Sequence, residues 1–304
     1  MTVLLNIFIQ NLLPVFLVMG TGVLLGVTVR PNVKAISRTT FYALAPCLIF
    51  SGLTGTPLTG AEAQQVALFA VLATLAGMLV AWLAATLLGW RGQHRRALVL
   101  PVLVINTGNF GLSVVLFAFG PDAQARAMLY FVTTAVMASS LGVAVAAGGG
   151  TLRQVLGNLV RIPLLYAAVA ALVVGAFPQF QVPELLMRPI ELLGRAAVPM
   201  MLLILGLQLA RSADSLRDNI GSIALASFLR LVVAPALALP VAWLTGVDGL
   251  TFQACMLEAG MPAGVTSTVL SLEYDLAPEL VTGTVFFSTL CSAFTLSVLI
   301  SVIG

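Results

Sequence analysis

The chain has 304 residues, of which 60% are hydrophobic and only 8% are charged, and its mean hydropathy is +1.09. Soluble domains carry about 25% charged residues, so this composition excludes a soluble globular protein and indicates an integral membrane protein. The formal net charge of +3 is too small to indicate a nucleic-acid partner. A spanning helix needs about 20 apolar residues, so the chain is long enough for about ten spans.

Apolar runs follow one another along the whole chain. Short separators with turn residues divide them, such as Arg30-Pro31-Asn32 and Gly120-Pro121-Asp122. We therefore predict ten transmembrane helices. The runs cover residues 5–29, 33–55, 63–89, 96–119, 124–147, 155–177, 189–211, 219–245, 250–272 and 278–303.

The basic residues are distributed unequally between the separators. If the N-terminus is outside, the separators after the odd-numbered helices up to the seventh are cytoplasmic. These separators and their flanks then hold most of the Lys and Arg residues, as the positive-inside rule requires. We predict a multi-pass protein of the cell (inner) membrane with both termini extracytoplasmic. The residues concerned are Arg30, Lys34, Arg38, Arg91, Arg95, Arg96, Arg153, Arg161, Arg211 and Arg217.

The two halves of the chain resemble each other. Pro46 and Pro199 lie in similar apolar stretches, and Asn109-x-Gly111 matches Met261-x-Ala263 at nearly the same separation. Near-constant separations predict a duplicated five-helix unit. An odd number of helices gives the two copies opposite orientations, which is a common plan of secondary transporters. The predicted division is residues 1–147 for the first repeat, 148–154 for a short hinge and 155–304 for the second, inverted repeat.

The ninth run contains a carboxylate and an irregular stretch at its centre. A charge at this depth costs about 2.5–3.5 kcal/mol on insertion scales, so Glu258 is expected to face protein or water and to serve a purpose. Pro262 clashes with the carbonyl of Glu258 and leaves it without a helical partner. A helix broken at this depth lines a cavity or is buried in protein, which is typical of a transporter site. We therefore predict that Glu258, Met261, Pro262 and Gly264 bind substrate.

The fourth run contains two amides. Asn106 and Asn109 are three residues apart and would share a helix face, while Gly108 and Gly111 weaken the helix there. Two amides suit a polar, uncharged site that can donate to a carboxylate or coordinate an ion. A polar clamp between packed helices is the alternative. Because the other repeat also contains a broken helix, the ninth, we favour a substrate site at Asn106 and Asn109 over a polar clamp.

These two stretches, Asn-Thr-Gly-Asn-x-Gly-Leu and Glu-Ala-Gly-Met-Pro-Ala-Gly, resemble motifs of the auxin efflux carrier family. The resemblance covers the whole chain. It implies an all-α membrane protein with ten helices in two inverted repeats, in which helices 4 and 9 are broken and cross at the substrate site, as in NhaA and the bile acid carriers. It also implies that helices 1, 2, 6 and 7 form a scaffold for a moving domain.

For function, the resemblance implies a permease or efflux carrier that moves a small organic anion, a mono- or dicarboxylate, by alternating access. Two features depart from the family pattern. Ser113 stands where members commonly have a proline, so the break in helix 4 would depend on glycine and asparagine. The join between the halves is short, so the long cytoplasmic loop of the plant carriers is absent.

Arg230 is the second charge inside an apolar run, about 16 Å from either end, too deep for its side chain to reach an interface. It could attract the anion, pair with Glu258 or cap the carbonyls of a broken helix. We favour the last two interpretations. Burial and the Arg230 charge act in opposite directions on the protonation of Glu258. We expect Glu258 to couple transport to protons, with sodium coupling as the alternative.

Other function classes fit less well. His94, the single histidine, falls in a loop, and the sequence has no HExxH or GxSxG, so we do not expect an enzyme, catalytic residues, a cofactor or a metal site. A channel would also fit polar residues at mid-depth. A sodium-coupled symporter like the bile acid carriers is the nearest alternative. Ser51 and Gln208 are weaker candidates for lining the site. The expected partners are the anion, the lipid bilayer and a coupling ion, and a homodimer is compatible with the sequence.

Overall fold

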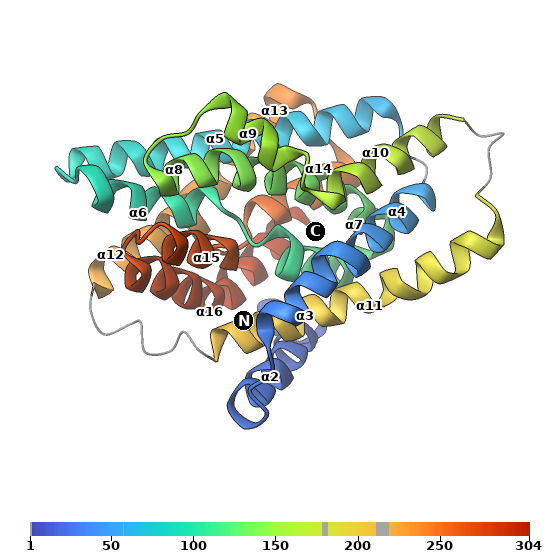
Figure 1. Ribbon diagram of the computed structural model, residues 1–304, viewed down its shortest axis with the longest axis horizontal. Helices are drawn as coiled ribbons and strands as arrows, with labels where there is room; N and C mark the ends of the chain where they lie inside the picture. Colours follow the sequence, from blue (N-terminus) through green and yellow to red (C-terminus); the bar gives the residue numbers. More distant parts are fainter. Residues whose placement is uncertain (1, 57, 178–181, 211–218) are drawn as a thin grey trace.

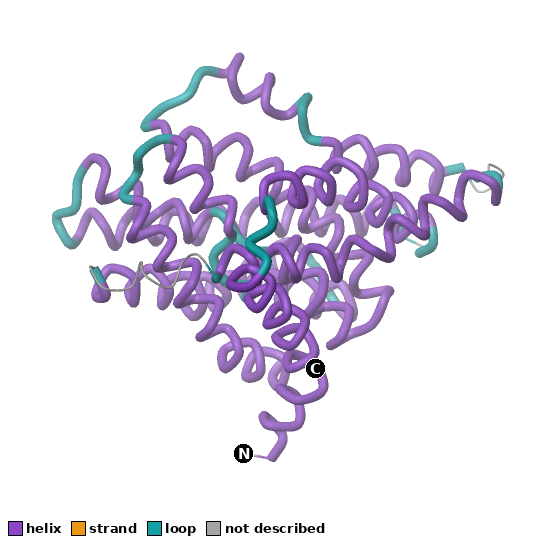
Figure 2. Tube along the Cα trace, turned by 60° about the horizontal axis from the view of Figure 1, so that its bottom comes forward, coloured by secondary structure: helices purple, strands orange, loops and turns teal. Residues whose placement is uncertain are grey.

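The computed structural model describes residues 2–56, 58–177, 182–210 and 219–304 of the chain (Figure 1). Within these residues the chain is almost entirely helical (Figure 2), and its one β-type pairing is an isolated antiparallel bridge between Ile105 and Ala263. The predicted all-α class is confirmed. The predicted basic residues Arg211 and Arg217 lie outside the described residues. In the part of the chain that the structure describes, the helices long and apolar enough to span a membrane are Val3–Thr28, Gly60–Leu87, Thr107–Ala147, Glu184–Leu209, Ile220–Thr245 and Pro278–Ile303.

Many of the long helical segments consist of two α-helices joined end to end through a turn of π-helix. In the first half the elements are α1 (Thr2–Ile7), η1 (Phe8–Leu12), α2 (Leu13–Thr28), α3 (Val33–Thr39), η2 (Thr40–Leu44), α4 (Ala45–Thr54), α5 (Gly60–Leu87), α6 (Gly92–Leu103), η3 (Thr107–Gly111), α7 (Leu112–Met137), η4 (Ala138–Gly142) and α8 (Val143–Ala147). In the second half they are α9 (Leu152–Leu159), α10 (Pro163–Ala176), α11 (Glu184–Leu209), α12 (Ile220–Phe228), η6 (Leu229–Val233), α13 (Ala234–Thr245), α14 (Gly249–Ala259), α15 (Val265–Glu273) and α16 (Pro278–Ile303).

Local signals explain two of the boundaries. Within α7 the backbone of Gly120 has a φ of 81°, and Pro121 follows it, so α7 is two helices joined by the turn that the sequence predicts at this place. The sixth predicted helix, residues 155–177, is instead divided, because α9 ends at Leu159 and α10 begins at Pro163. A proline at the first helical position favours a fresh start there, so the prediction of one continuous helix was wrong.

The helices gather into two groups (Figure 1). The panel bundle consists of α2, α4, α10 and α11, which pack on one another. The crossover bundle consists of α5, α6, α7 and α12 to α16, in which α5 packs on α6, α7 and α13, and α14 packs on α7. The panel bundle corresponds to the predicted helices 1, 2, 6 and 7. These are the helices that the family resemblance assigns to a scaffold, and that role stays a prediction.

Two glycines allow α2 and α11 of the panel bundle to pack closely. A Cβ atom on Gly22 of α2 would collide with the carbonyl oxygen of Leu203 on α11, and one on Gly206 of α11 would collide with the carbonyl oxygen of Met19 on α2. Small residues allow helix backbones to approach in this way inside membranes. The two glycines therefore allow the backbones of α2 and α11 to lie in contact.

Contacts between distant residues define the two ends of the molecule. At one end Gln253 donates to the carbonyl of Ile303, close to the C-terminus. At the other end Arg96 donates to the carbonyl of Ala146, and the Gln93 side chain donates to the carbonyl of Asp275. We call these the C-terminal end and the Arg96 end. The first turns of α6, which contain Arg96, are thus opposite to the C-terminus, because α16 runs from Pro278 near Asp275 to Ile303.

Candidate functional site

The centre of the crossover bundle is a place where two interrupted helices meet. The first interruption separates α6 from η3, and the second separates α14 from α15. The two unwound segments run antiparallel: the Asn106 N–H donates to the carbonyl of Pro262 at 2.9 Å, and the Gly264 N–H donates to the carbonyl of Val104 at 2.7 Å. A Cβ atom on Gly264 would lie 2.8 Å from the carbonyl oxygen of Ile105. The predicted interruptions in the fourth and ninth runs are confirmed, and glycine at 264 allows their close approach.

The position of the first interruption differs from the prediction. It covers residues 104–106, whereas Gly108 and Gly111 lie inside the π-helical turn η3 that follows. The backbone of Asn106 is not helical, with φ of −86° and ψ of 53°. The expectation that Asn106 and Asn109 share a helix face was therefore wrong. The match of Asn109–Gly111 to Met261–Ala263 is also wrong in structural terms, because the first stretch is helical and the second is extended.

Arg230 on η6 joins both interrupted helices. Its side chain is 2% exposed; one guanidinium nitrogen donates to the carbonyl of Val102 at 3.1 Å and the other donates to the carbonyl of Ala259. These carbonyls belong to the C-terminal turns of α6 and α14, which carry the negative ends of the helix dipoles. Among the described residues, Arg230 forms no ion pair with Glu258. The capping interpretation of Arg230 is thus the one that its contacts support.

The carbonyl that needs this partner is not the predicted one. The carbonyl of Glu258 accepts a hydrogen bond from the Met261 N–H at 3.1 Å, so Pro262 does not leave it unpaired. The unwinding begins one residue later, which frees the carbonyl of Ala259 for Arg230. The expectation that Pro262 leaves the carbonyl of Glu258 without a partner was therefore wrong.

The Glu258 side chain is fully buried, and neither carboxyl oxygen has a hydrogen-bond partner within the described structure. The carboxyl group packs against Gly111 of η3 so closely that a Cβ atom on residue 111 would overlap it. Tyr130 of α7 and Cys255 of α14 are also fully buried. Because unpaired buried polar groups are uncommon in native proteins, each of them invites a functional explanation.

Further buried polar atoms without a hydrogen-bond partner lie on the elements that surround Glu258. They are Nδ2 of Asn106 in the first interruption and Oγ of Ser113 on α7. The interior of the crossover bundle is therefore polar beyond what its internal hydrogen bonds satisfy.

Asn109 is the accessible amide of the crossover. Every other residue from Ala97 to Val115 is buried, whereas Asn109 keeps part of its surface exposed. It lies in η3, which packs on α11, and the ring of its neighbour Phe110 meets the edge of Phe16 on α2 at a centroid distance of 5.8 Å. Asn109 thus lies where the crossover bundle faces the panel bundle. The other predicted site residues, Asn106, Gly108, Gly111, Met261, Pro262 and Gly264, are buried.

A cavity of about 690 Å³ lies between the two bundles, a size suited to a small molecule. One wall comes from α2, α4 and α11 and the other from α7. Ser51 lines it, whereas Gln208 and the predicted crossover residues do not. The polar residues that line it are Ser51, Thr56, Asp122, Gln124, Glu191 and Arg195.

One of these side chains connects the cavity to the crossover. Gln124 donates from Nε2 to the carbonyl of Leu112, the residue that follows η3, at 3.1 Å. This hydrogen bond joins the cavity wall to the first residue of α7. No pattern in the sequence indicates that Asp122 and Gln124 line a cavity, because neighbours from other helices form the opposite wall.

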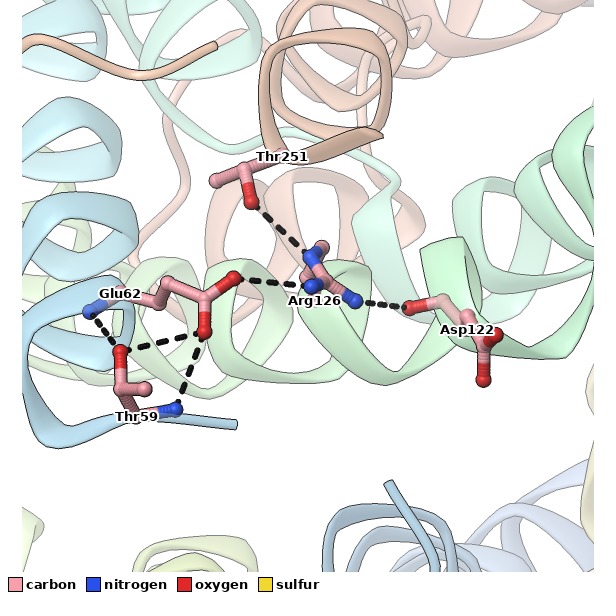
Figure 3. Close-up of polar contacts among 5 residues, drawn as sticks. All are labelled: Thr59, Glu62, Asp122, Arg126 and Thr251. Carbon is pink, nitrogen blue, oxygen red and sulfur yellow. Dashed lines mark hydrogen bonds and ion pairs between the residues drawn. The ribbon is translucent and has the colours of Figure 1, made fainter. Parts of the chain in front are cut away.

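A polar cluster at the C-terminal end holds three helix starts together (Figure 3). The Arg126 guanidinium on α7 pairs with the Glu62 carboxylate of α5 at 2.8 Å, and it donates to the Thr251 hydroxyl of α14 at 2.9 Å and to the carbonyl of Asp122 at 2.9 Å. Glu62 also accepts from the N–H and the hydroxyl of Thr59. The sequence does not indicate this cluster, because its members lie on separate helices.

Comparison with known proteins gives a consistent result. The family described as Membrane transport protein matches residues 7–147 and 150–300 of the chain. An "Uncharacterized transporter" of Methanothermobacter thermautotrophicus is 29% identical over 90% of this chain and 89% of its own length. The "Putative malonate transporter" of Rhizobium meliloti is 29% identical over 65% of this chain and 64% of its own. "Auxin efflux carrier component 1" of Arabidopsis thaliana is 25% identical over 44% of this chain and 22% of its own.

Proposed function

Because the chain belongs to the membrane transport protein family that includes the auxin efflux carriers, we propose that it moves a small organic anion, a mono- or dicarboxylate, by alternating access. The observation that carries this proposal is the crossover, where two interrupted helices pair beside the accessible amide of Asn109. The malonate relative supports the choice of a carboxylate. The protein thus acts as a permease or efflux carrier of the cell membrane.

The helix ends at the crossover are suited to an anion. The second half of each interrupted helix begins at the crossover, at Thr107 and at Val265, so both place the positive ends of their dipoles and free N–H groups there. Such helix starts bind anionic groups readily. Arg230 satisfies the opposite, negative ends at Val102 and Ala259, so that they do not repel the substrate.

In this proposal Asn109 donates its amide to the substrate carboxylate. Asn106, Gly108 and Gly111 shape the fourth-helix side of the site by keeping the backbone close and free of bulk. The extended segment opposite them completes the site. The residues proposed from the ninth helix are Glu258, Met261, Pro262 and Gly264.

We also propose the wider organisation that the sequence predicts. Ten helices form two inverted five-helix repeats, residues 1–147 and 155–304, with the panel bundle as the scaffold and the crossover bundle as the moving part. The C-terminal end faces the outside, so the cavity of about 690 Å³ opens to the extracytoplasmic side.

Glu258 is proposed to carry a coupling proton. An ionised carboxylate without a cation or a hydrogen bond is far more costly to bury than a neutral acid. Among the described residues, no cation pairs with the Glu258 side chain, which is fully buried. In this proposal the group is neutral when it is enclosed and releases its proton when the moving domain exposes it.

The function is tested by binding and uptake of malonate, because a ligand that binds the folded state raises its melting temperature. We expect malonate to stabilise the purified protein and to enter proteoliposomes with saturable kinetics. Asn109→Asp should weaken binding more than tenfold, since it places a negative charge beside the anion. Asn32→Asp is the matched control, because it adds the same charge at a helix cap far from the site.

Three outcomes decide against the proposal. Equal affinity in wild type and Asn109→Asp would move the site elsewhere. Single-channel currents would indicate a channel. Uptake that depends on sodium and not on a pH gradient would indicate a symporter of the bile-acid-carrier type.

A further inference from the structure

The cavity between the two bundles carries charges on both of its walls. Asp122 lies on the wall from the crossover bundle, directly after the Gly120–Pro121 turn of α7. Glu191 and Arg195 lie on the opposite wall, on α11 of the panel bundle. Of the residues that line the cavity, these three are the charged ones. An acid and a base therefore lie on walls that belong to two different bundles.

Asp122 is fixed in place while its carboxylate remains available. Its backbone carbonyl accepts a hydrogen bond from Arg126, which in turn is held by Glu62 and Thr251 (Figure 3). Its carboxylate points away from the Arg126 guanidinium (Figure 3), and in the described part of the chain it takes part in no ion pair. The cluster thus positions a free negative charge at the cavity wall.

Arg195 is held only weakly by its neighbour. Its guanidinium lies 3.6 Å from the carboxylate of Glu191, and the two side chains are 81% and 48% exposed. Exposed pairs of this kind on one helix contribute little to stability. By contrast, Arg188 on the same helix binds Glu184 at 2.7 Å. Arg195 can therefore exchange its partner at little cost.

We propose that Asp122 and Arg195 form the ion pair that closes the C-terminal end of the cavity when the two bundles come together. The proposal rests on the alternating access proposed above, because that mechanism requires the cavity to close at one end before it opens at the other. The open cavity leaves the two charges apart. Closure excludes water from between the walls, and it strengthens the attraction between the opposite charges.

The first test measures cavity closure through Ser51, which lines the cavity. Ser51→Cys is placed in a background with Cys47, Cys255 and Cys291 changed to serine, and its labelling by a membrane-impermeant thiol reagent is timed. All variants also carry Glu191→Gln, so that Glu191 offers a lysine at position 122 no new partner. In this background Asp122→Lys and Arg195→Glu each put like charges on the two walls. We expect each change to oppose closure and to speed the labelling at least threefold, while the double variant Asp122→Lys/Arg195→Glu returns it to the original rate.

Arg188→Glu is the control for Arg195→Glu, since it makes the same charge change on the same helix outside the cavity wall. Its labelling rate should stay at the original value. Only variants that elute as single species and keep the melting temperature of the parent are compared. Labelling that is equal in all variants, or that the double variant does not restore, overturns the proposal.

The second test measures whether the two walls meet. In the same cysteine-free background, with Ser51 unchanged, Asp122→Cys/Arg195→Cys should form a disulfide under mild oxidation, which requires Cα atoms within about 7 Å of each other. Asp122→Cys/Arg188→Cys should not. Absence of the first disulfide overturns the proposal, and so does a disulfide without any charge effect on labelling. Neither test uses a substrate, so a failure of malonate binding leaves both results interpretable.

Discussion

The carboxyl group of Glu258 on α14 lies directly against the backbone of Gly111 in η3, where a side chain on residue 111 would overlap it. The contact joins the last turn before one interruption to the first turn after the other. It therefore relates the protonation of one residue to the packing of the turn that carries Asn109.

We predict that Gly111→Ala destabilises the protein by about 1–3 kcal/mol, the usual cost of overfilling a packed interior. In a Glu258→Ala background the same change should cost much less, because the overlapping group is gone. Thermal unfolding of the single and double variants measures this coupling. Gly20→Ala is the control, since nothing lies within 4 Å of its added methyl group. Additive effects of the two substitutions would show that the contact is not significant.

Arg230 should be more important for stability than for substrate affinity. Arg230→Met leaves the carbonyls of Val102 and Ala259 without a donor, and hydrogen bonds to a charged group contribute about 1.5–3 kcal/mol each. We expect a large fall in melting temperature, with a smaller fall in Arg230→Lys, which keeps the charge but not the forked geometry. A stable Arg230→Met variant with greatly weakened malonate binding would instead assign Arg230 to the substrate.

Glu258→Gln separates coupling from structure. The neutral amide imitates the protonated acid, so we expect melting within a few degrees of wild type and continued exchange of malonate across proteoliposomes. Accumulation driven by a pH gradient should be lost. A stable variant that still concentrates malonate under a pH gradient would rule out Glu258 as the proton carrier. If Glu258→Gln strongly destabilised the protein, Glu258 would instead form a structural ion pair with Arg230, which the described residues do not show.

The Arg126 cluster allows a comparison of two ion pairs. The side chains of Arg126 and Glu62 are 13% and 27% exposed, whereas those of Arg188 and Glu184 are both 76% exposed. Arg126→Met also loses the contacts to Thr251 and Asp122, so we expect a loss of about 2 kcal/mol or more. Arg188→Met should cost less than about 1 kcal/mol. Equal melting temperatures for the two variants would contradict the conclusion that Arg126 holds the three helix starts together.

The orientation in the membrane is a separate prediction. With both termini extracytoplasmic, cysteines introduced at Gly304 and at Arg95 should react with an impermeant reagent from opposite sides of the membrane. Their positions at the C-terminal end and at the Arg96 end agree with this arrangement. Labelling of both positions from the same side would refute it.

The two interruptions differ in how far sequence could locate them. Pro262 and Gly264 break a helix by local chemistry, and the structure unwinds residues 260–264 as expected. Val104 and Ile105 carry no such signal, because both are ordinary residues of apolar helices. Their extended backbone depends on hydrogen bonds to Pro262 and Gly264, which come from the other half of the chain.

Some side-chain contacts could also be predicted from the sequence, and others depend on how the helices pack. The depth of Arg230 in its apolar run predicted an inward-pointing cation, but its acceptors lie on α6 and α14, and no pattern along η6 indicates them. The Glu191–Arg195 pair follows from its spacing on one helix. That Asp122 faces the same cavity follows only from the packing of α7 beside α4 and α11.

The crossover is joined by hydrogen bonds between main-chain groups of Val104, Asn106, Pro262 and Gly264. Main-chain groups are the same in nearly every residue, so this junction imposes little on the side chains at most of these positions. A lineage could therefore exchange the side chains that meet the cargo while the crossing itself persists. Such an arrangement separates the inheritance of the architecture from the inheritance of substrate choice, and it allows one fold to acquire new cargoes by a few substitutions.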